Sequence, residues 1–247
     1  SKKWQRQKEK VAKSIQDLAG ELLEIQARRR AMGGIVFGPD SDWQAEFEQS
    51  FPYQETPDQL AAVEQIKGDM QQPVAMDRLL CGDVGYGKTE LAMRAVFKAV
   101  ENGRQAAVLV PTTVLCVQHS RTFSERFADF PVCIETLNRF KTAKQAQDII
   151  KRARQGKVDI LIGTHRLLSG DIGFSDLGLL IIDEEQRFGV EHKEKLKKLR
   201  FNVDILTMTA TPIPRTLHMA MLGLRDISSL ATPPLDRRSI VTAVTSY

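Results

Sequence analysis

The sequence predicts an α/β fold, a mostly parallel sheet with helices on both faces, preceded by a long N-terminal helix. From residue 58 onward, short runs of Val, Ile and Leu alternate with helical stretches, which is typical of parallel strands buried on both faces. Residues 1–32 instead show a helical repeat of apolar residues without proline. The chain has 247 residues, of which 42 % are hydrophobic and 27 % charged, so it can bury a core without disulfides or metals.

The N-terminal segment, residues 1–32, is predicted to be a basic linker helix. Residues 1–31 contain nine Lys or Arg and four acidic residues, a net charge of +5, whereas the other 216 residues carry −1. The basic pI therefore gives no argument that the body of the chain binds nucleic acid. The helix could pack on its own domain, or it could connect two modules and present its basic face to a partner. Its apolar seam consists of Trp4, Val11, Ile15, Leu18, Leu22, Ile25 and Met32, and Gly33-Gly34 ends it.

The α/β lobe is expected to span residues 51–232, after a connector at residues 33–50. A linker is expected at residues 233–247, because Pro233 and Pro234 disfavour a helix there. Strands are predicted from the continuous apolar runs, at residues 76–81, 106–110, 132–137, 158–162, 178–182 and 203–208. Helices are predicted between and after these strands, at residues 58–71, 88–102, 113–128, 142–155, 190–199 and 214–222.

Several protein classes are excluded by what the sequence lacks. The three cysteines and four histidines form no CxxC or HExxH pattern, so no zinc site is predicted. Such sparse thiols are typical of the reducing cytoplasm. The longest apolar run, residues 177–182, is too short to span a bilayer, so no membrane partner is expected. Because no apolar signal region is present, we expect an internal piece of a longer cytoplasmic protein.

A phosphate-binding loop is predicted at residues 82–89, GDVGYGKT, which fits the pattern GxxxxGK[ST]. The pattern follows a predicted strand and opens a predicted helix, where glycines let backbone N–H groups converge on phosphate oxygens. In such loops the lysine binds the β- and γ-phosphates and the threonine hydroxyl is a Mg²⁺ ligand. A chance glycine-rich turn is the alternative. The predicted nucleotide site consists of Gly82, Gly85, Gly87, Lys88 and Thr89.

Two adjacent carboxylates, Asp183 and Glu184, are predicted to complete an ATPase site. They stand at the end of the apolar strand predicted at residues 178–182, in the sequence DEEQ. Asp183 is suited to bind Mg²⁺ through water, and Glu184 to orient or deprotonate the attacking water. The alternative is a polar strand end followed by a helix cap. Since a phosphate loop and a carboxylate pair reinforce each other, the sequence predicts ATP hydrolysis with Mg²⁺.

These motifs resemble those of superfamily 2 helicase-type motors. TPDQ at residues 56–59 is similar to the adenine-reading glutamine motif, and residues 108–119, 162–168 and 209–216 are similar to motifs Ia, Ib and III. The stretches GDVGYGKTE, DEEQRFGV and TATPIPRTL resemble the branch that contains bacterial transcription-repair coupling factors and branch-migrating fork helicases. FPYQETPDQ, before the phosphate loop, is more similar to the coupling-factor family. The resemblance implies a first RecA-like translocase lobe, with residues 1–32 as its relay helix.

The resemblance also implies roles for individual residues. Gln59 would read adenine, and Gln186 stands where close relatives often have histidine. Helix N-caps for the threonines, a solvated cation for Arg139 and helix initiation beside Pro214 are the alternatives. The sugar-phosphate backbone of one DNA strand would be contacted by Thr112, Thr113, Thr164, His165, Arg166 and Arg139. The nucleotide site would be coupled to motion by Gln186, Thr209, Thr211, Arg215 and Thr216.

The function implied is that of the ATP-binding half of a double-stranded DNA translocase. In the family, such a motor displaces stalled RNA polymerase and recruits excision-repair proteins through other domains. A second RecA-like lobe carries the arginine fingers, so this fragment alone is expected to bind ATP weakly and hydrolyse it negligibly. Three alternatives remain: a lobe of a branch-migrating fork helicase, a lobe of an RNA helicase, or a docking module whose nucleotide site serves regulation.

Overall fold

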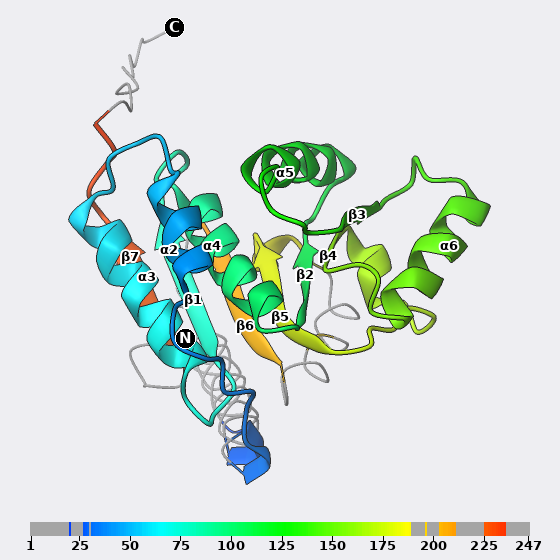
Figure 1. The fold of residues 1–247 in the computed structure, drawn as a ribbon, viewed down its shortest axis with the longest axis horizontal. Helices are drawn as coiled ribbons and strands as arrows, with labels where there is room; N and C mark the ends of the chain where they lie inside the picture. The colour runs from blue at the N-terminus through cyan, green and yellow to red at the C-terminus, as the bar shows by residue number, and fades with distance from the viewer. Residues whose placement is uncertain are drawn as a thin grey trace, which may run out of the picture.

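A computed structural model describes residue 20, residues 27–29, 31–188, residue 196, and residues 203–210 and 225–235. Within these residues, one seven-stranded sheet has the strand order β3-β4-β2-β5-β6-β1-β7, and all of its neighbouring strands are parallel (Figure 1). The predicted α/β class with a parallel sheet is therefore confirmed. Most of the predicted N-terminal helix, the helices predicted at 190–199 and 214–222, and residues 236–247 lie outside the described part.

All six predicted strands are present, and their ends lie within two residues of the predicted ones. A seventh strand, β7 (Asp226–Leu230), was not predicted. It lies at an edge of the sheet, and its sequence DISSL contains two serines in place of a continuous apolar run. The six predicted strands are β1 (Asp77–Gly82), β2 (Gln105–Leu109), β3 (Ile134–Leu137), β4 (Ile160–Gly163), β5 (Leu177–Asp183) and β6 (Asp204–Thr209).

The helices before and between these strands also agree with the prediction within two residues. They are α3 (Pro57–Met70), α4 (Lys88–Glu101), α5 (Thr113–Arg126) and α6 (Ala143–Arg154). Two short 3₁₀ helices, η1 (His165–Leu168) and η2 (Glu185–Arg187), follow β4 and β5.

The segment predicted as a connector contains a further helix, α2 (Asp42–Gln49), which the sequence did not predict. Ser41 caps it by accepting a hydrogen bond from the backbone N–H of Gln44. Phe47 is fully buried, and its ring stacks on that of Phe97 of α4 with 4.4 Å between the ring centroids. Because an eight-residue helix is marginal on its own, this buried ring is what fixes α2 on the lobe.

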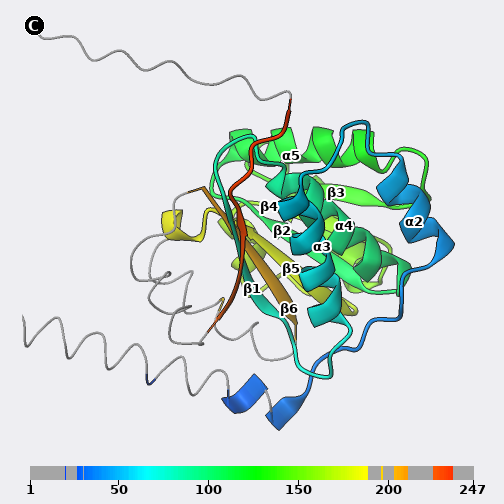
Figure 2. The same ribbon diagram turned by 90° about the vertical axis from the view of Figure 1, so that its left-hand side faces the viewer.

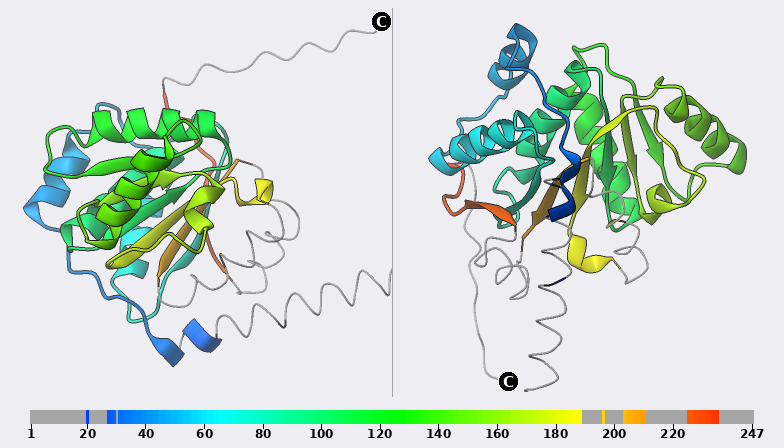
Figure 3. Two further views of the ribbon diagram at one scale, coloured as in Figure 1. Left: turned by 90° about the vertical axis from the view of Figure 1, so that its right-hand side faces the viewer. Right: turned by 90° about the horizontal axis from the view of Figure 1, so that it is seen from below.

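The sheet separates two apolar cores, as expected for strands covered on both faces. Along β2, Ala106 and Val108 face the core formed with α2, α3, α4 and α5, whereas Ala107 and Leu109 face the core formed with α6 and η1. Figure 2 shows α3 and α4 side by side on the first face. Figure 1 and the right panel of Figure 3 place α6 at the opposite end of the molecule from α2 and α3.

Parallel pairing brings three motifs to one edge of the sheet. β6 lies between β5 and β1, with Asp183 of β5 opposite Met208, and Cys81 of β1 opposite Thr209. The carboxyl ends of these three strands therefore lie together, as do the loops that follow them. The phosphate loop, the DEEQ turn and the start of motif III are thus neighbours.

The opposite edge of the sheet contains a buried carboxyl group, Asp204, at the start of β6. Asp204 is 1 % exposed, and its Oδ1 accepts a hydrogen bond of 2.7 Å from the backbone N–H of Met76. Arg29, from the N-terminal segment, donates to the carbonyl oxygens of Met76 at 2.7 Å and Val203 at 3.2 Å. Burial raises the pKa of Asp204 to about 7, although the Met76 N–H and the charge of Arg29 act against this.

Replacing Asp204 with Asn is expected to remove a pH dependence of stability. Since the folded state binds the Asp204 proton more tightly than the unfolded state, this group favours folding below about pH 4. That contribution is lost as the pH rises to about 7, by up to about 4 kcal/mol. Urea unfolding of wild type and D204N between pH 4.5 and 8 measures the difference.

The exposed Asp171 provides the control, because Arg166 lowers its pKa to about 2. The variant D171N should therefore keep the wild-type slope between pH 4.5 and 7. Parallel stability curves for D204N and wild type would contradict the assignment to Asp204.

Candidate functional site

The phosphate loop joins β1 to α4, with Gly82 as the last residue of the strand and Lys88 as the first of the helix. Gly85 and Gly87 have φ angles of 83° and 81°, in the left-handed region that glycine adopts without strain. Lys88 Nζ donates hydrogen bonds to the carbonyl oxygens of Gly82 at 2.5 Å and Asp83 at 2.9 Å. Burial lowers the pKa of Lys88, while the nearby carboxylates of Glu184 and Asp183 act against this.

Gln59, predicted to read adenine, connects α3 to the phosphate loop. Its Oε1 accepts from the backbone N–H of Thr56 at 2.8 Å, which forms a capping box at the start of α3. Its Nε2 donates to the carbonyl oxygen of Tyr86 at 2.9 Å. A Cβ atom at Gly87 would lie 2.4 Å from this nitrogen, so a larger residue would displace the Gln59 amide, and the φ angle of Gly87 itself favours glycine.

The predicted carboxylates occupy a strained turn at the end of β5. Glu184 has φ 52° and ψ 56°, a left-handed conformation that costs a non-glycine residue roughly 1–3 kcal/mol. Its backbone N–H donates to the carbonyl oxygen of Met208 at 2.9 Å, and its Oε1 accepts from the backbone N–H of Ala210 at 3.1 Å. The end of β6 therefore holds Glu184 by both its backbone and its side chain.

Gln186 and Thr209, predicted to couple the site to motion, lie beside Glu184. Gln186 Nε2 donates to Glu184 Oε2, and Thr209 Oγ1 lies 3.5 Å from Gln186 Oε1. One side-chain amide thus bridges the DEEQ turn and the start of motif III. The other predicted coupling residues, Thr211, Arg215 and Thr216, lie outside the described residues.

Asp183 has a neighbour that the sequence reasoning missed. Nε2 of His119, on α5, lies 3.2 Å from Asp183 Oδ2, and His119 is 6 % exposed. The sequence showed only that His119 belongs to no zinc pattern. Its contact with Asp183 depends on α5 crossing over the sheet between β2 and β3, so spacing along the chain gives no signal for it.

The predicted nucleic-acid contacts lie along the same edge of the sheet, in its other half. Thr112 caps α5 by accepting from the backbone N–H of Leu115 at 3.2 Å, and Thr113 begins that helix. Thr164 is buried, and its side chain makes no capping hydrogen bond to η1. These residues follow β2 and β4, which are neighbours in the sheet.

The two arginines of this group are positioned differently. Arg166 of η1 forms a two-bond ion pair with the carboxylate of Asp171, at 2.5 Å for both nitrogens. The Arg139 guanidinium lies 5.4 Å from the centroid of the exposed Phe140 ring. His165 is the first residue of η1. The structure thus groups these residues on one sheet edge with the phosphate loop.

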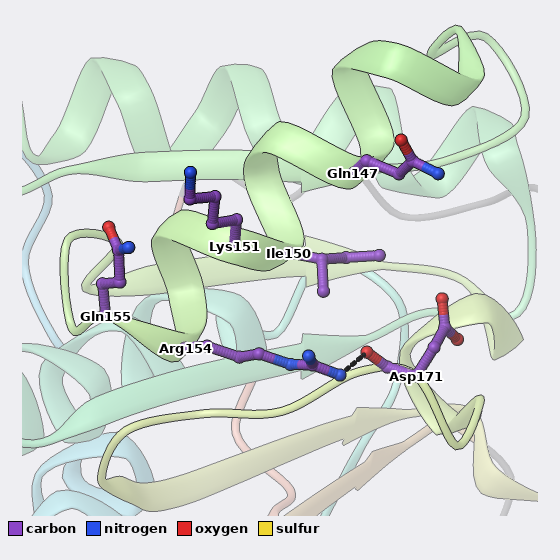
Figure 4. A pocket seen from close by; sticks show the side chains of 6 residues that line it. All are labelled: Gln147, Ile150, Lys151, Arg154, Gln155 and Asp171. Atoms are coloured by element: carbon purple, nitrogen blue, oxygen red, sulfur yellow. Dashed lines mark hydrogen bonds between the residues drawn. The ribbon is translucent and has the colours of Figure 1, made fainter.

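A pocket of about 460 Å³ lies apart from the phosphate loop and the DEEQ turn, between α6 and the loop that follows η1 (Figure 4). Arg154 crosses it and donates to the carbonyl oxygen of Asp171 at 2.5 Å. The pocket lies on the β3–β4 side of the sheet, whereas the phosphate loop follows β1 near the other edge. It is lined by Gln147, Ile150, Lys151, Arg154, Gln155 and Asp171.

The residues at the phosphate loop fit Mg²⁺ that is shared with nucleotide phosphates. Among the described residues, no group of three His, Cys, Asp or Glu side chains could hold a metal ion. Mg²⁺ does not need one, because it is held by one or two protein oxygens together with phosphates and water. The hydroxyl of Thr89, in the first turn of α4, and the carboxylate of Asp183 are suitable hard ligands. No helix in the described part of the chain is long and apolar enough to cross a membrane.

Known proteins are similar to this chain in sequence over almost its whole length. The chain is 59 % identical over 244 residues to the transcription-repair-coupling factor of Bacillus subtilis (strain 168), a match that covers 99 % of the chain and 21 % of the relative. Its identity to the factor of Escherichia coli (strain K12) is 56 %, with the same coverage. The chain thus spans about a fifth of the length of these curated relatives.

A solved structure and the sequence pattern of a protein family also match this chain. The fold is similar to that of RecG bound to a three-way DNA junction, with a TM-score of 0.77 and 35 % identity, covering 92 % of this chain and 31 % of that one. The sequence pattern of the DEAD/DEAH box helicases matches residues 56–220, which include the glutamine motif, the phosphate loop and the DEEQ turn. The predicted resemblance to helicase-type motors is confirmed at the level of the family. The chain belongs to the DEAD/DEAH box helicase family.

Proposed function

We propose that this chain is the ATP-binding lobe of a double-stranded DNA translocase that displaces stalled RNA polymerase and couples transcription to nucleotide excision repair. The observation that carries the proposal is the meeting of the phosphate loop, the strained Glu184 turn and the end of β6 at one sheet edge. The similarity of the chain to transcription-repair-coupling factors over 99 % of its length supports double-stranded DNA as the substrate and RNA polymerase and excision-repair proteins as the partners. RNA polymerase and the excision-repair proteins are contacted through other parts of the whole protein, in the cytoplasm.

The residues of the site divide the work of ATP hydrolysis. Lys88 exchanges the carbonyl oxygens of Gly82 and Asp83 for the β- and γ-phosphates, and the loop N–H groups bind the remaining phosphate oxygens. Thr89 and Asp183 hold Mg²⁺, which neutralises charge on the phosphates. Glu184 orients the attacking water and accepts its proton.

The other half of the same edge contacts DNA. The proposed donors for a sugar-phosphate backbone follow strands β2, β4 and β3, and they are Thr112, Thr113, His165, Arg166 and Arg139. Thr164 is buried, so its hydroxyl is not counted among these donors. Such contacts are indifferent to base sequence and weaken as salt rises. Closure of a second RecA-like lobe over the nucleotide would turn hydrolysis into movement along the DNA.

The central test replaces Glu184 with Gln in the whole protein. Because Gln keeps the carbonyl oxygen that accepts from the Ala210 N–H but cannot accept a proton, E184Q should still bind ATP. Its DNA-stimulated ATPase kcat should fall by about 10²–10⁴-fold. Phosphate release with double-stranded DNA measures the loss, and fluorescent-nucleotide binding measures the affinity.

Polymerase binding, polymerase displacement and stimulation of the ATPase by RNA or DNA, measured on the whole protein, separate the alternatives. The variant K88A, as the control, should lose nucleotide binding and polymerase displacement together while polymerase binding remains. Displacement that survives in K88A would favour the docking module, and stimulation by RNA but not by DNA would favour an RNA helicase. Wild-type ATPase activity in E184Q would contradict the proposed base.

The isolated 247-residue chain is expected to be nearly inactive. An arginine finger from a second lobe contributes about 10³–10⁵ in rate in related phosphoryl-transfer enzymes, so turnover should fall by at least about 10³-fold relative to the whole protein. Phosphate release by equal concentrations of the chain, the two-lobe motor and the whole protein tests this. Turnover by the isolated chain within tenfold of the whole protein would contradict it.

His119 is expected to hold Asp183 in place for Mg²⁺. Loss of a hydrogen-bond partner of a metal ligand typically lowers metal affinity by about 10–100-fold, so H119A should need correspondingly more Mg²⁺ for nucleotide binding. Gln places an amide nitrogen near the position of Nε2, so H119Q should recover part of the affinity. The exposed Arg121, on the same helix, provides the control R121A. Equal Mg²⁺ requirements for H119A and R121A would show that His119 has no such role.

A further inference from the structure

Four residues of alternating charge form a series of ion pairs that the predicted motifs do not explain, and we call this series the charge chain. It consists of Arg29, Asp77, Arg225 and Glu185. Arg29 Nη1 lies 2.9 Å from Asp77 Oδ2, and Arg225 Nε lies 2.9 Å from Asp77 Oδ1. Arg225 Nη1 then lies 3.1 Å from Glu185 Oε2. Both arginines are buried, with 3 % and 6 % exposed.

The Arg225 side chain runs from the amino ends of the strands toward their carboxyl ends. Arg225 precedes β7, which pairs with β1 so that Asp226 lies opposite Arg78. Its Nε is therefore beside Asp77 at the start of β1, while its Nη2 donates to Thr207 Oγ1 in the middle of β6. The other terminal nitrogen, Nη1, donates to Glu185, beyond the carboxyl end of β5. One side chain thus ties three strands to the DEEQ turn.

Glu185 is the residue through which this contact acts on the site. It begins η2 directly after Glu184, whose left-handed backbone must be held by its surroundings. Backbone hydrogen bonds from Arg187 to Glu184, at 2.9 Å, and from Phe188 to Glu185, at 3.1 Å, close this turn. Fixing the Glu185 carboxylate therefore fixes the turn that carries Glu184.

We infer that Arg225 is a positioning residue for ATP hydrolysis: it holds Glu185, and thereby sets the direction of Glu184 toward the nucleotide. The inference rests on the proposed function of Glu184. A buried apolar side chain of similar size would stabilise the fold about as well as this charge, whose desolvation is costly. The planar guanidinium adds two hydrogen bonds in fixed directions, to Thr207 and Glu185, beside its ion pair with Asp77, and neither an apolar side chain nor a lysine can supply that geometry.

The test uses the whole protein with double-stranded DNA and the variants R225K, E185Q and R225K/E185Q. R225K keeps the charge but loses the fork, so its kcat should fall by about tenfold or more while KM for ATP stays within about threefold. E185Q should give a similar loss. Because both changes break one contact, the double variant should be no slower than the slower single variant.

Arg78 provides the matched control, because it is the next residue after Asp77 on β1 and is 7 % exposed. Its Nε lies 2.6 Å from Asp69 Oδ2 and its Nη1 donates to Ser228 at 3.0 Å, so it pairs with α3 and β7 and not with the DEEQ turn. R78K should therefore lower the melting temperature without lowering kcat.

Three results would overturn the inference alone: R225K with kcat within twofold of wild type, losses that multiply in the double variant, or an equal kcat loss in R78K. If R225K does not fold, E185Q carries the test, and a wild-type kcat in E185Q overturns the inference. A wild-type protein without DNA-stimulated ATPase activity would overturn the proposed function and this inference together.

Discussion

The structure depends on one constraint, the parallel pairing of β5, β6 and β1. Because these strands run in the same direction and are neighbours, segments that are separated in sequence, ending at Gly82, Asp183 and Thr209, end at the same edge. Lys88, Asp183 and Thr209 meet for this reason alone. An antiparallel β6 would place the start of motif III at the other edge, and Glu184 would lose the Ala210 N–H and the Met208 carbonyl that hold it.

The conformation of Glu184 depends on this pairing of strands. A left-handed glutamate persists only where its surroundings offset a cost of roughly 1–3 kcal/mol. Here the offsetting contacts come from two places. The end of β6 binds Glu184 directly, and later in the turn Gln186 donates to Glu184 while Glu185 belongs to the charge chain. The site is therefore built by neighbouring strands more than by the DEEQ sequence itself.

Features that depend on residues close together in the sequence could be predicted, whereas features that depend on contacts between distant residues could not. Continuous apolar runs and a glycine-rich loop are local, so six strands, four helices and the phosphate loop could be predicted. β7 lacks an apolar run, and α2 is held by Phe47 on Phe97, a contact across 50 residues. The partners His119–Asp183 and Arg225–Glu185 are set by crossovers between strands, so no spacing along the chain reveals them.

On the proposed function, the near-neutral charge of the lobe fits a contact with DNA that must be released at every step. Arg166 is not held ready as a bare cation, because both of its terminal nitrogens bind Asp171, whose pKa of about 2 keeps the carboxylate charged at neutral pH. A DNA phosphate that contacts Arg166 therefore replaces one anion by another. Because the pair is partly exposed, such an exchange changes the free energy far less than the binding of an unpaired arginine would. Asp171 thus weakens the proposed contact of Arg166 with the backbone, and a weak contact is one that the proposed translocase could break.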